Sequence, residues 1–411
     1  MTTNPNAAPA VTLDSSGGRH LYAQADTLRA AGPAVRVRMP HNVTAWAVTR
    51  GDIAKQLLTH PDVSKDARTS WPGHTPGAVP WLYPWTDVVS MFTSDGDDHH
   101  RLRRLVDRAF TPSRVEAMRP AIQAIVTNLL DDLQTQDLTA PLDLRAHFSY
   151  PIPTRVICDL FGVPAGQRPQ MLRVIDAVLT TDVTAAEAET TNQALGAAMQ
   201  ALVDTKRTKP GEDMTSLLLA THEEDGDRLS HTELTSTLIA MIGAGSETAV
   251  ALINASVREL LAHPDQLAAV LADPTRWFDV IEEALRLHPP LMFLPLRYAR
   301  ADIDLGDGVV IREGEAIIIA FGAHGRDPGV HQDPEAFRID RQDKQHLAFG
   351  YGIHYCLGAR LAKLEAEVAL PALFQRFPRI TLACATGRLQ PQRSFISTDV
   401  TELPVVLQPA P

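Results

Sequence analysis

The sequence predicts a mainly helical protein with small β-sheets at its periphery. Apolar residues recur at the three- and four-residue spacing of amphipathic helices in residues 112–134, 191–207, 230–261 and 256–272. Apolar and polar residues alternate, as in half-buried strands, only in short stretches. No internal repeat or linker-like composition divides the 411 residues. We therefore expect a single domain over residues 19–411, preceded by a flexible N-terminal segment over residues 1–18.

Strand signals occur near both ends and in the middle of the second half. Residues 34–40 and 44–49 alternate apolar and polar positions, which predicts a half-buried hairpin. Residues 302–321 place a Gly-Asp-Gly turn between β-branched runs, and residues 395–407 suggest another short hairpin. Residues 63–93 are rich in Trp, Pro and Gly, which predicts a long loop of a kind that is often functional.

Composition and charge narrow the functional classes. The hydrophobic share of 45% and the charged share of 21% are ordinary for a globular protein. A net charge of −11 argues against nucleic-acid binding. No apolar run reaches the roughly 18 residues of a membrane span, and the N-terminus does not resemble a signal peptide. Cys158, Cys356 and Cys384 are too widely spaced for a disulfide framework or a metal knuckle. We expect a cytoplasmic protein that does not bind membranes.

The helix expected over residues 230–261 is the longest. It begins with a capping box, because Glu233 follows the N-cap candidate Ser230 by three residues. A helix of this length would cross the whole domain. Gly243 and Gly245 lie inside it, where each glycine costs about 1 kcal/mol relative to alanine. Taken alone, these glycines indicate a close helix crossing.

The residues that follow these glycines favour a different interpretation. Glu247 and Thr248 lie in otherwise apolar surroundings. The Thr248 hydroxyl can donate to the carbonyl of Ala244, four residues earlier, which opens the helical hydrogen-bond ladder locally. A distorted turn with a carboxylate and a hydroxyl is typical of a proton-delivery site beside a small bound molecule.

The segment FGYGIHYCLGAR, residues 349–360, surrounds Cys356 with glycines and precedes a strong helical pattern. A helix N-terminus favours an anion and predicts a lowered pKa for the thiol. Four interpretations remain open at this point. Cys356 is a nucleophile with His354 as base, a zinc ligand with His346 and His354, a haem ligand, or an inert buried thiol.

Two further patterns are weak when taken alone. Glu283 and Arg286 share one helix face at i,i+3 spacing, and their apolar neighbours favour a partly buried ion pair. The basic run over residues 99–108 lies in a helical pattern, where its plainest interpretation is a solvated helix face.

Together these motifs resemble one family, the cytochrome P450 haem-thiolate monooxygenases. AGSETA over residues 244–249 is similar to the family's oxygen-activation motif, and Glu283 with Arg286 to its E-x-x-R motif. The resemblance runs from about residue 20 to the end and is greatest to the soluble actinobacterial members. The segment around the cysteine matches the highly specific haem-loop motif F-G-x-G-x-H-x-C-x-G through Phe349, Gly350, Gly352, His354, Cys356 and Gly358.

The resemblance implies a cytochrome P450 fold, haem b as cofactor, and insertion of one oxygen atom from O2 into a lipophilic small molecule. Steroids, macrolides and other polyketides are the implied substrates. Electrons would come from an NAD(P)H-dependent reductase through a ferredoxin, and the protein would be a monomer. A peroxide-driven haem peroxygenase and a non-catalytic haem sensor or carrier are the alternatives. Neither alternative accounts as well for the Glu247–Thr248 pair.

The resemblance also assigns roles to residues. Cys356 would be the axial iron ligand, and Glu247 and Thr248 would relay protons during oxygen activation. Glu283, Arg286 and Arg341 would form a structural network. The expected haem-binding residues besides Cys356 are His99, Arg103, Ala244, Arg297, Phe349, Gly350, His354 and Gly358. A basic surface for an acidic ferredoxin is expected at Arg104, Arg108, Arg360 and Lys363.

The resemblance to the family also implies a substrate pocket, and the residues expected to line it are largely apolar. Its members are Val88, Met91, Gly243, Leu291, Phe293, Leu294, Phe395 and Ile396. Three positions depart from the family pattern. Ser246 stands where His is common, Ala249 replaces a second threonine, and Gly325 replaces the Asn of A-N-R-D-P.

Overall fold

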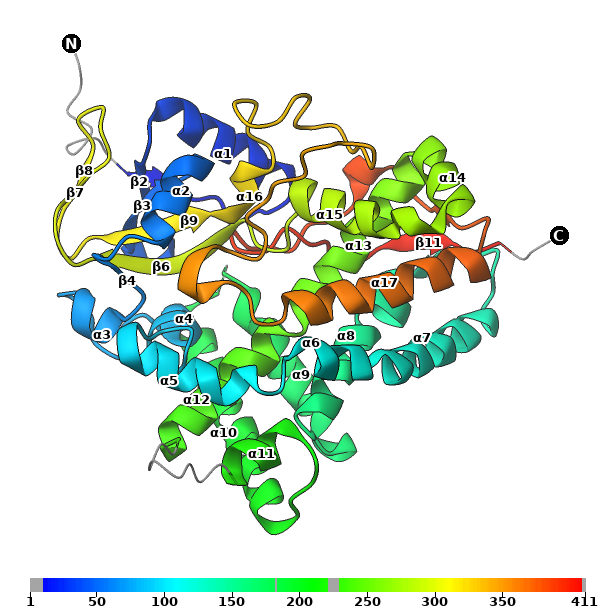
Figure 1. Cartoon of the computed structure of the whole chain (residues 1–411), viewed down its shortest axis with the longest axis horizontal. Coiled ribbons are helices and arrows are strands. Elements are labelled where there is room, and N and C mark those ends of the chain that lie inside the picture. Colours follow the sequence, from blue (N-terminus) through cyan, green and yellow to red (C-terminus); the bar gives the residue numbers. More distant parts are fainter. Residues whose placement is uncertain (1–9, 182, 221–228, 409–411) are drawn as a thin grey trace.

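The computed structural model describes residues 10–181, 183–220 and 229–408. Helices make up most of the molecule, and the main sheet lies along one side, next to α1 and α2 (Figure 1). The predicted mainly helical fold with small peripheral sheets is confirmed.

The described α-helices are α1 (Arg19–Ala31), α2 (Gly51–Leu58), α3 (Ala67–Ser70), α4 (Tyr83–Thr86), α5 (Gly96–Asp107), α6 (Pro112–Ala117), α7 (Arg119–Gln134), α8 (Pro151–Leu160), α9 (Arg168–Asp176), α10 (Ala185–Thr208), α11 (Met214–Ala220), α12 (His231–Ala244), α13 (Glu247–Ala262), α14 (Pro264–Ala272), α15 (Trp277–Leu287), α16 (Phe321–His324) and α17 (Ala359–Arg376).

The strands form three sheets. The largest has the order β1-β2-β3-β9-β6-β4, a second has the order β10-β11-β5, and β7 pairs with β8. Their bounds are β1 (Val11–Thr12), β2 (Val35–Arg38), β3 (Thr44–Val48), β4 (Val63–Ser64), β5 (Leu142–Asp143), β6 (Phe293–Ala299), β7 (Ile303–Asp304), β8 (Val310–Ile311), β9 (Ala316–Ala320), β10 (Thr381–Leu382) and β11 (Pro404–Val406).

Most strand predictions hold. β2 and β3 form the predicted antiparallel hairpin, and β7 and β8 flank the Gly-Asp-Gly turn. The predicted hairpin over residues 395–407 is wrong, because β11 pairs with β10 and β5 instead. The expected flexible segment, residues 1–18, lies partly outside the described residues. Within its described part, β1 pairs with β2.

Proline and glycine divide three of the predicted helices. Residues 112–134 form α6 and α7, which meet just before Pro120. Residues 256–272 are divided at Pro264, whose missing N–H suits the first turn of a helix. The predicted long helix is divided into α12 and α13 at Gly245 and Ser246, and its N-terminal capping box is present.

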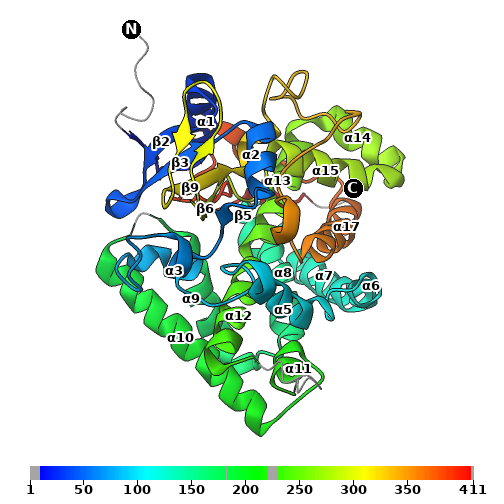
Figure 2. The same cartoon turned by 60° about the vertical axis from the view of Figure 1, so that its left-hand side comes forward.

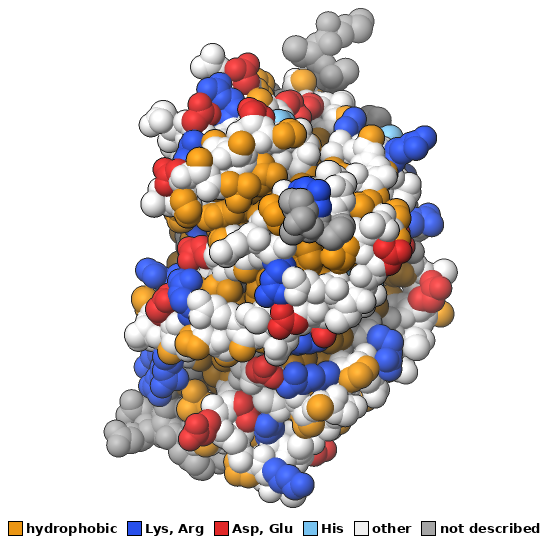
Figure 3. Space-filling view, turned by 90° about the vertical axis from the view of Figure 1, so that its right-hand side faces the viewer, with side chains coloured by type: hydrophobic (Ala, Val, Ile, Leu, Met, Phe, Trp, Pro, Cys, Tyr) orange, Lys and Arg blue, Asp and Glu red, His pale blue; other side chains and the backbone are white. Residues whose placement is uncertain are grey.

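Other segments complete the surroundings of the site. The predicted loop over residues 63–93 is interrupted by β4, α3, a short 3-10 helix and α4. Figures 1 and 2 both place α11 at the end of the molecule remote from β2 and β3. On the face beside the C-terminal end, cationic and anionic side chains are interspersed with apolar ones (Figure 3).

The apolar segment His231–Ala262, which spans α12 and α13, is long and apolar enough to cross a membrane. Its most apolar window is, however, 72% buried inside the protein. Its side chains contribute to a large apolar core shared with α7, α8, α10, α15 and α17. The pair of helices therefore has the packing of core helices, and it carries the turn described next.

Candidate active site

The loop that carries Cys356 is closed by backbone hydrogen bonds. The Gly350 amide donates to the Leu347 carbonyl, and the Cys356 amide donates to the Phe349 carbonyl, both at 2.8 Å. Gly350 and Gly352 have φ values of 74° and 76°. These left-handed conformations favour glycine, so both glycines are needed for this loop. The loop delivers Cys356 three residues before α17 begins.

Cys356 lines a cavity, and its accessible surface makes it an exposed residue. Burial raises the pKa of this thiol, although the Gly358 and Ala359 amides and Arg103 act to lower it. The sequence-based expectation of a net lowered pKa is therefore wrong for the protein without a metal. Desolvation of the thiolate outweighs the favourable amide groups. A bound metal cation would offset the cost of desolvating the thiolate, because metal coordination deprotonates a thiol.

One cavity brings most of the predicted site residues together. It extends from the Cys356 loop to the turn between α12 and α13, and most of its other lining is apolar. The predicted residues that line it are Met91, His99, Arg103, Gly243, Ala244, Thr248, Leu291, Leu294, Arg297, Phe349, Gly350, His354, Cys356 and Gly358.

Four predicted pocket residues do not line this cavity. Phe293 precedes Leu294 in β6, and successive side chains of a strand point to opposite faces. Leu294 therefore reaches the cavity while Phe293 is buried in the core beside the sheet. Phe395 and Ile396 lie in the same core, and Val88 lies in the helical core. The side chains of these four residues therefore belong to the apolar cores and not to the cavity lining.

The turn between α12 and α13 is held open by side chains. The Thr248 hydroxyl donates to the Ala244 carbonyl at 2.6 Å, as the spacing predicts. The Ser246 hydroxyl donates to the Ile242 carbonyl at 2.7 Å, which gives this unusual serine a structural role. A Cβ at Gly245 would lie 2.5 Å from the Ile157 side chain, whereas one at Gly243 would meet nothing within 4 Å. Gly245 thus permits close packing, and Gly243 leaves cavity space open.

Glu247 is buried but is not among the residues that line the cavity. Its carboxylate accepts two hydrogen bonds from Arg145, at 2.9 and 2.7 Å, and one from Gln392 at 3.1 Å. Arg145 also lies 3.3 Å from Asp399. Burial raises the pKa of Glu247, and the positive charge of Arg145 opposes this shift. In this structure the carboxylate is therefore held outside the cavity lining by an ion-pair network.

Three basic residues beside the cavity have shielded nitrogen atoms without a hydrogen-bond partner among the described residues: both ring nitrogens of His99, Nη1 of Arg297 and Nε2 of His354. Nε2 of His354 lies 3.7 Å from Asp95 Oδ1, within ion-pair range. Burial lowers the pKa of His99, that of Arg297 to about 10 and that of His354 to about 4. Unpaired buried donors are costly. The cluster is therefore suited to bind an anionic group that enters the cavity.

The Arg103 guanidinium, in contrast, has hydrogen-bond acceptors in the protein. Its Nη1 donates to the carbonyls of Ile353 and Tyr355 at 3.0 and 2.9 Å, so that α5 is tied to the Cys356 loop. Of the predicted basic surface, Arg104, Arg108 and Arg360 are exposed. Lys363 instead lies 2.5 Å from Glu282.

Glu365 is a buried acid that the sequence analysis missed. It lines the cavity, its side chain is 2% exposed, and its Oε2 has no hydrogen-bond partner among the described residues. Burial alone raises its pKa to about 8. The helical spacing from Leu361 and Val368 places it on the apolar face of α17 and is the signal that could have identified it.

Glu365→Gln is expected to remove a pH-dependent loss of stability. The native pKa lies above the ordinary value of 4.5, so the native protein keeps its proton as pH rises from 5 to 8 while the unfolded chain has lost it. Wild-type stability should therefore fall by about 3 kcal/mol over this range, and the glutamine variant should escape that loss. The Tm advantage of the variant should appear at pH 8 and be small at pH 5. An advantage that is equal at both pH values would contradict the assignment.

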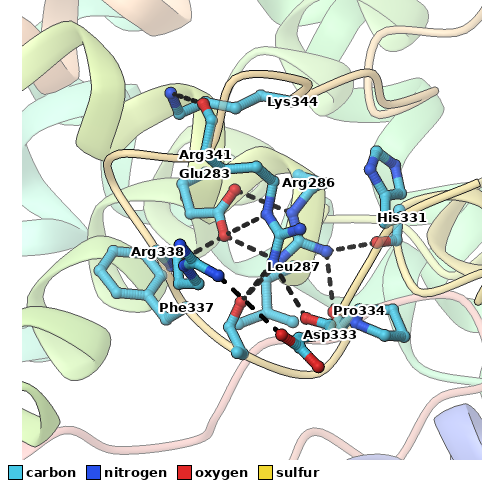
Figure 4. A network of polar contacts seen from close by, with 12 residues as sticks. Glu283, Arg286, Leu287, His331, Asp333, Pro334, Phe337, Arg338, Arg341 and Lys344 are labelled. Atoms are coloured by element: carbon cyan, nitrogen blue, oxygen red, sulfur yellow. Dashed lines mark hydrogen bonds and ion pairs between the residues drawn. The ribbon is translucent and has the colours of Figure 1, made fainter.

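The Glu283–Arg286 pair is fully buried, with 2.8 Å between Oε1 and Nη2. Arg286 also donates to the carbonyls of Gly325, Pro334 and Ala336. Arg341 lies 3.1 Å from Glu283 Oε1. Figure 4 draws the three side chains in one network of polar contacts. The three predicted network residues thus fasten α15 to the segment that precedes the Cys356 loop.

The departure at Gly325 has a steric explanation in this network. A Cβ at Gly325 would lie 2.0 Å from the Arg286 carbonyl oxygen. The backbone at Gly325 can therefore approach Arg286 closely enough to accept its hydrogen bond. Ala249 lines the cavity beside Thr248, where its small side chain leaves room for a ligand.

Comparisons with known proteins were made after this geometry was established. The Cytochrome P450 family model matches residues 278–388. The 2-hydroxy-5-methyl-1-naphthoate 7-hydroxylase of Streptomyces carzinostaticus is 40% identical over 395 residues, covering 95% of this chain and 96% of the relative. The chain belongs to the cytochrome P450 family. It is an oxidoreductase, a monooxygenase that binds protoporphyrin IX haem.

Two further similarities extend over nearly the whole P450 chain. The 6-deoxyerythronolide B hydroxylase of Saccharopolyspora erythraea is 38% identical over 388 residues, covering 92% of this chain and 94% of the relative. The solved structure of CYP154A1 from Streptomyces coelicolor A3(2) is similar with a TM-score of 0.92 and 45% identity. That match covers 97% of this chain and 100% of the other.

The residues of this P450 fit haem on independent grounds. A single thiolate satisfies the ligand requirement, and no cluster of three or more His, Cys, Asp or Glu residues suited to another metal occurs in the described part of the chain. The unpartnered nitrogen atoms of His99 and Arg297, with His354 nearby, suit the two propionate groups of protoporphyrin. A Cβ at Gly358 would meet nothing within 4 Å, so there is open space next to the thiol.

Proposed function

We propose that this P450 inserts one oxygen atom from O2 into a lipophilic small molecule. One observation carries the proposal: a single, largely apolar cavity is lined both by Cys356 and by the open turn with Thr248. An apolar cavity favours a lipophilic substrate. By their names, two relatives act on 2-hydroxy-5-methyl-1-naphthoate and on 6-deoxyerythronolide B. These names, together with the solved structure named 'Testerone bound CYP154C4 from Streptomyces sp. ATCC 11861', support steroids, macrolides and other polyketides as the substrate classes.

The proposed roles follow from the contacts. Cys356 binds the haem iron, and His99, Arg103, Arg297 and His354 hold the propionates. Bound haem supplies the chemistry of O2 activation. The chain contributes an apolar wall that orients the substrate and limits the entry of water. Thr248 presents its hydroxyl to the cavity, where it positions a proton donor, while its own proton is shared with the Ala244 carbonyl.

Glu247 is proposed as the proton source behind Thr248. It has to rotate away from Arg145 and Gln392 to reach the cavity, because both hold it in the observed position. Its raised pKa favours uptake of a proton after that separation. Arg145 is then a positioning residue, which controls how often the carboxylate becomes available.

Thr248→Ala is expected to keep substrate binding and to lower the yield of product per NAD(P)H by about tenfold or more, with electrons lost to peroxide. Loss of a positioned acid–base group costs about a hundredfold or more in rate when no other route replaces it. The measurement is the ratio of product and peroxide to NAD(P)H consumed. Thr248→Ser retains a hydroxyl and should stay close to wild type. Unchanged coupling in the alanine variant would refute the role.

Electrons are proposed to come from a ferredoxin with its NAD(P)H-dependent reductase. Three exposed arginines support this: Arg104 on α5, Arg108 directly after α5, and Arg360 on α17. They lie near the haem-binding loop, because α5 is hydrogen-bonded to the Cys356 loop through Arg103. Such charges chiefly raise the rate of encounter with an acidic partner. We further propose that the protein works as a monomer in the cytoplasm.

One experiment distinguishes the proposed monooxygenase from its two alternatives, a peroxide-driven peroxygenase and a non-catalytic haem sensor or carrier. Purified protein is supplied either with ferredoxin, reductase, NAD(P)H and O2, or with peroxide alone. Isotopic labelling of the dioxygen identifies the source of the inserted atom. The proposal predicts labelled product in the reductase-driven reaction. Product formed only with peroxide would indicate a peroxygenase, and haem binding without product under either condition would indicate a sensor or carrier.

A further inference from the structure

Trp85 forms part of the cavity wall, and its indole N–H is a donor without a described acceptor. Trp85 lies in α4 and lines the cavity together with Met91 and Phe92. Its Nε1 is shielded from solvent and has no hydrogen-bond acceptor among the described residues. Buried indole N–H groups usually have a partner, and a missing partner is costly.

The rest of the substrate side is poor in polar groups. His99, Arg103, Arg297, His354 and Tyr355 lie on the haem-binding side or in the Cys356 loop, and Glu365 lies on α17. Apart from these residues, only Trp85 and Thr248 contribute side-chain nitrogen or oxygen atoms to the described lining. The Thr248 hydroxyl already donates to Ala244. Trp85 is therefore the one side-chain donor of this described region that has no acceptor.

The Trp85 ring is held in place by its neighbours. Phe92 meets it edge to face, with 6.0 Å between the ring centres. Phe92 is in turn covered by the buried ammonium of Lys65, 3.9 Å from its ring centre. Lys65 Nζ is fixed by donating to the Pro295 carbonyl at 2.9 Å. The Phe92 contact limits the motion of the indole, and a small turn of the ring presents the shielded N–H to a ligand in the cavity.

We infer that Trp85 is a specificity-determining residue, whose N–H donates to an oxygen acceptor, such as a ketone or lactone carbonyl, on the otherwise apolar substrate. The inference rests on the proposed function, because it names a feature of that substrate. A site built to hydrogen-bond a polar group discriminates strongly against an analogue that lacks it. An aliphatic hydrocarbon of the same shape is therefore a poor ligand.

The test compares ligand pairs that differ only in a carbonyl: tetralone with tetralin, and cyclododecanone with cyclododecane. Calorimetric titration of the oxidised holoprotein measures each Kd without turnover, so this result is independent of whether the proposed reaction occurs. In at least one pair, the wild type should bind the ketone about tenfold more tightly than the hydrocarbon, as expected for one hydrogen bond.

Trp85→Phe should weaken ketone binding to the level of the hydrocarbon and change hydrocarbon binding by less than about twofold. Benzothienylalanine at the same position keeps the bicyclic ring, lacks the N–H, and should behave in the same way. Trp81→Phe is the matched control. Trp81 is buried nearby, its Nε1 already donates to the Pro40 carbonyl at 3.3 Å, and it does not line the cavity. The Trp81 variant should keep the ketone preference.

Three results would overturn the inference. The first is a wild type without ketone preference, including one that binds neither member of either pair. The second is a Trp85 variant that keeps the preference or weakens both ligands equally. The third is loss of haem from the Trp85→Phe protein, which would assign the N–H to the cofactor. A normal thiolate spectrum of the wild-type protein alongside any of these results would leave the proposed function intact.

Discussion

Replacing Cys356 by His is expected to abolish monooxygenase activity while the protein still binds haem. Imidazole is a good iron ligand, but it does not supply the electron density that a thiolate donates. The loss should exceed about a hundredfold, the upper range for removing even an outer-shell partner of a metal. The measurement is product formed per haem with saturating ferredoxin and reductase.

Cys384→Ser is the control for this variant. Cys384 is partly exposed and is not among the residues that line the cavity. Its variant should match wild type in haem content and product. Full activity in the Cys356→His protein would show that the thiolate is not required. Equal loss in both variants would point to a general effect of replacing cysteine.

Arg286→Met is expected to cause the largest loss of stability. It leaves Glu283 buried with Arg341 as its remaining cationic partner and removes the donor from the Gly325, Pro334 and Ala336 carbonyls. Breaking a buried pair by removing one partner costs about 3–5 kcal/mol. That is a large part of the roughly 5–15 kcal/mol that stabilises a typical protein. The measurement is Tm together with the yield of haem-containing protein.

Arg312→Met provides the matched comparison. Arg312 lies 2.5 Å from Asp302, but its side chain is 60% exposed. Removing an exposed pair should cost less than about 1 kcal/mol. Similar losses in both variants would contradict the special importance of the buried network. A stable Arg286→Met protein with full haem content would contradict it directly.

The sequence predicted those parts of the fold that depend on local patterns. Alternation predicted the β2–β3 hairpin, and Ser230 with Glu233 predicted where α12 begins. Periodicity alone did not reveal where helices break. The break between α12 and α13 depends on the hydroxyl of Ser246 and on the close approach of Ile157 to Gly245. The second of these is a contact between residues far apart in the chain.

Sequence motifs predicted part of the candidate site as well. Motif matches predicted Cys356, Thr248 and four basic residues as site residues, and the structure brings all of them to one cavity. It did not predict that Arg145, from a distant segment, holds Glu247 away from the cavity. It also assigned Phe293 to the pocket, although strand alternation gives that place to Leu294. Trp85 and Glu365 were missed because their importance comes from buried polar atoms without partners, which sequence patterns do not show.

The central claim is that Cys356 binds the haem iron as a thiolate at one side of this cavity. The most direct test is the absorption spectrum of the reduced, carbon monoxide-bound protein, recorded for wild type and for Cys356→His. We predict the red-shifted Soret band of a thiolate ligand in the wild type and its replacement by a globin-like band in the variant. A globin-like band in the wild type, or a thiolate band that persists in the variant, would contradict the account.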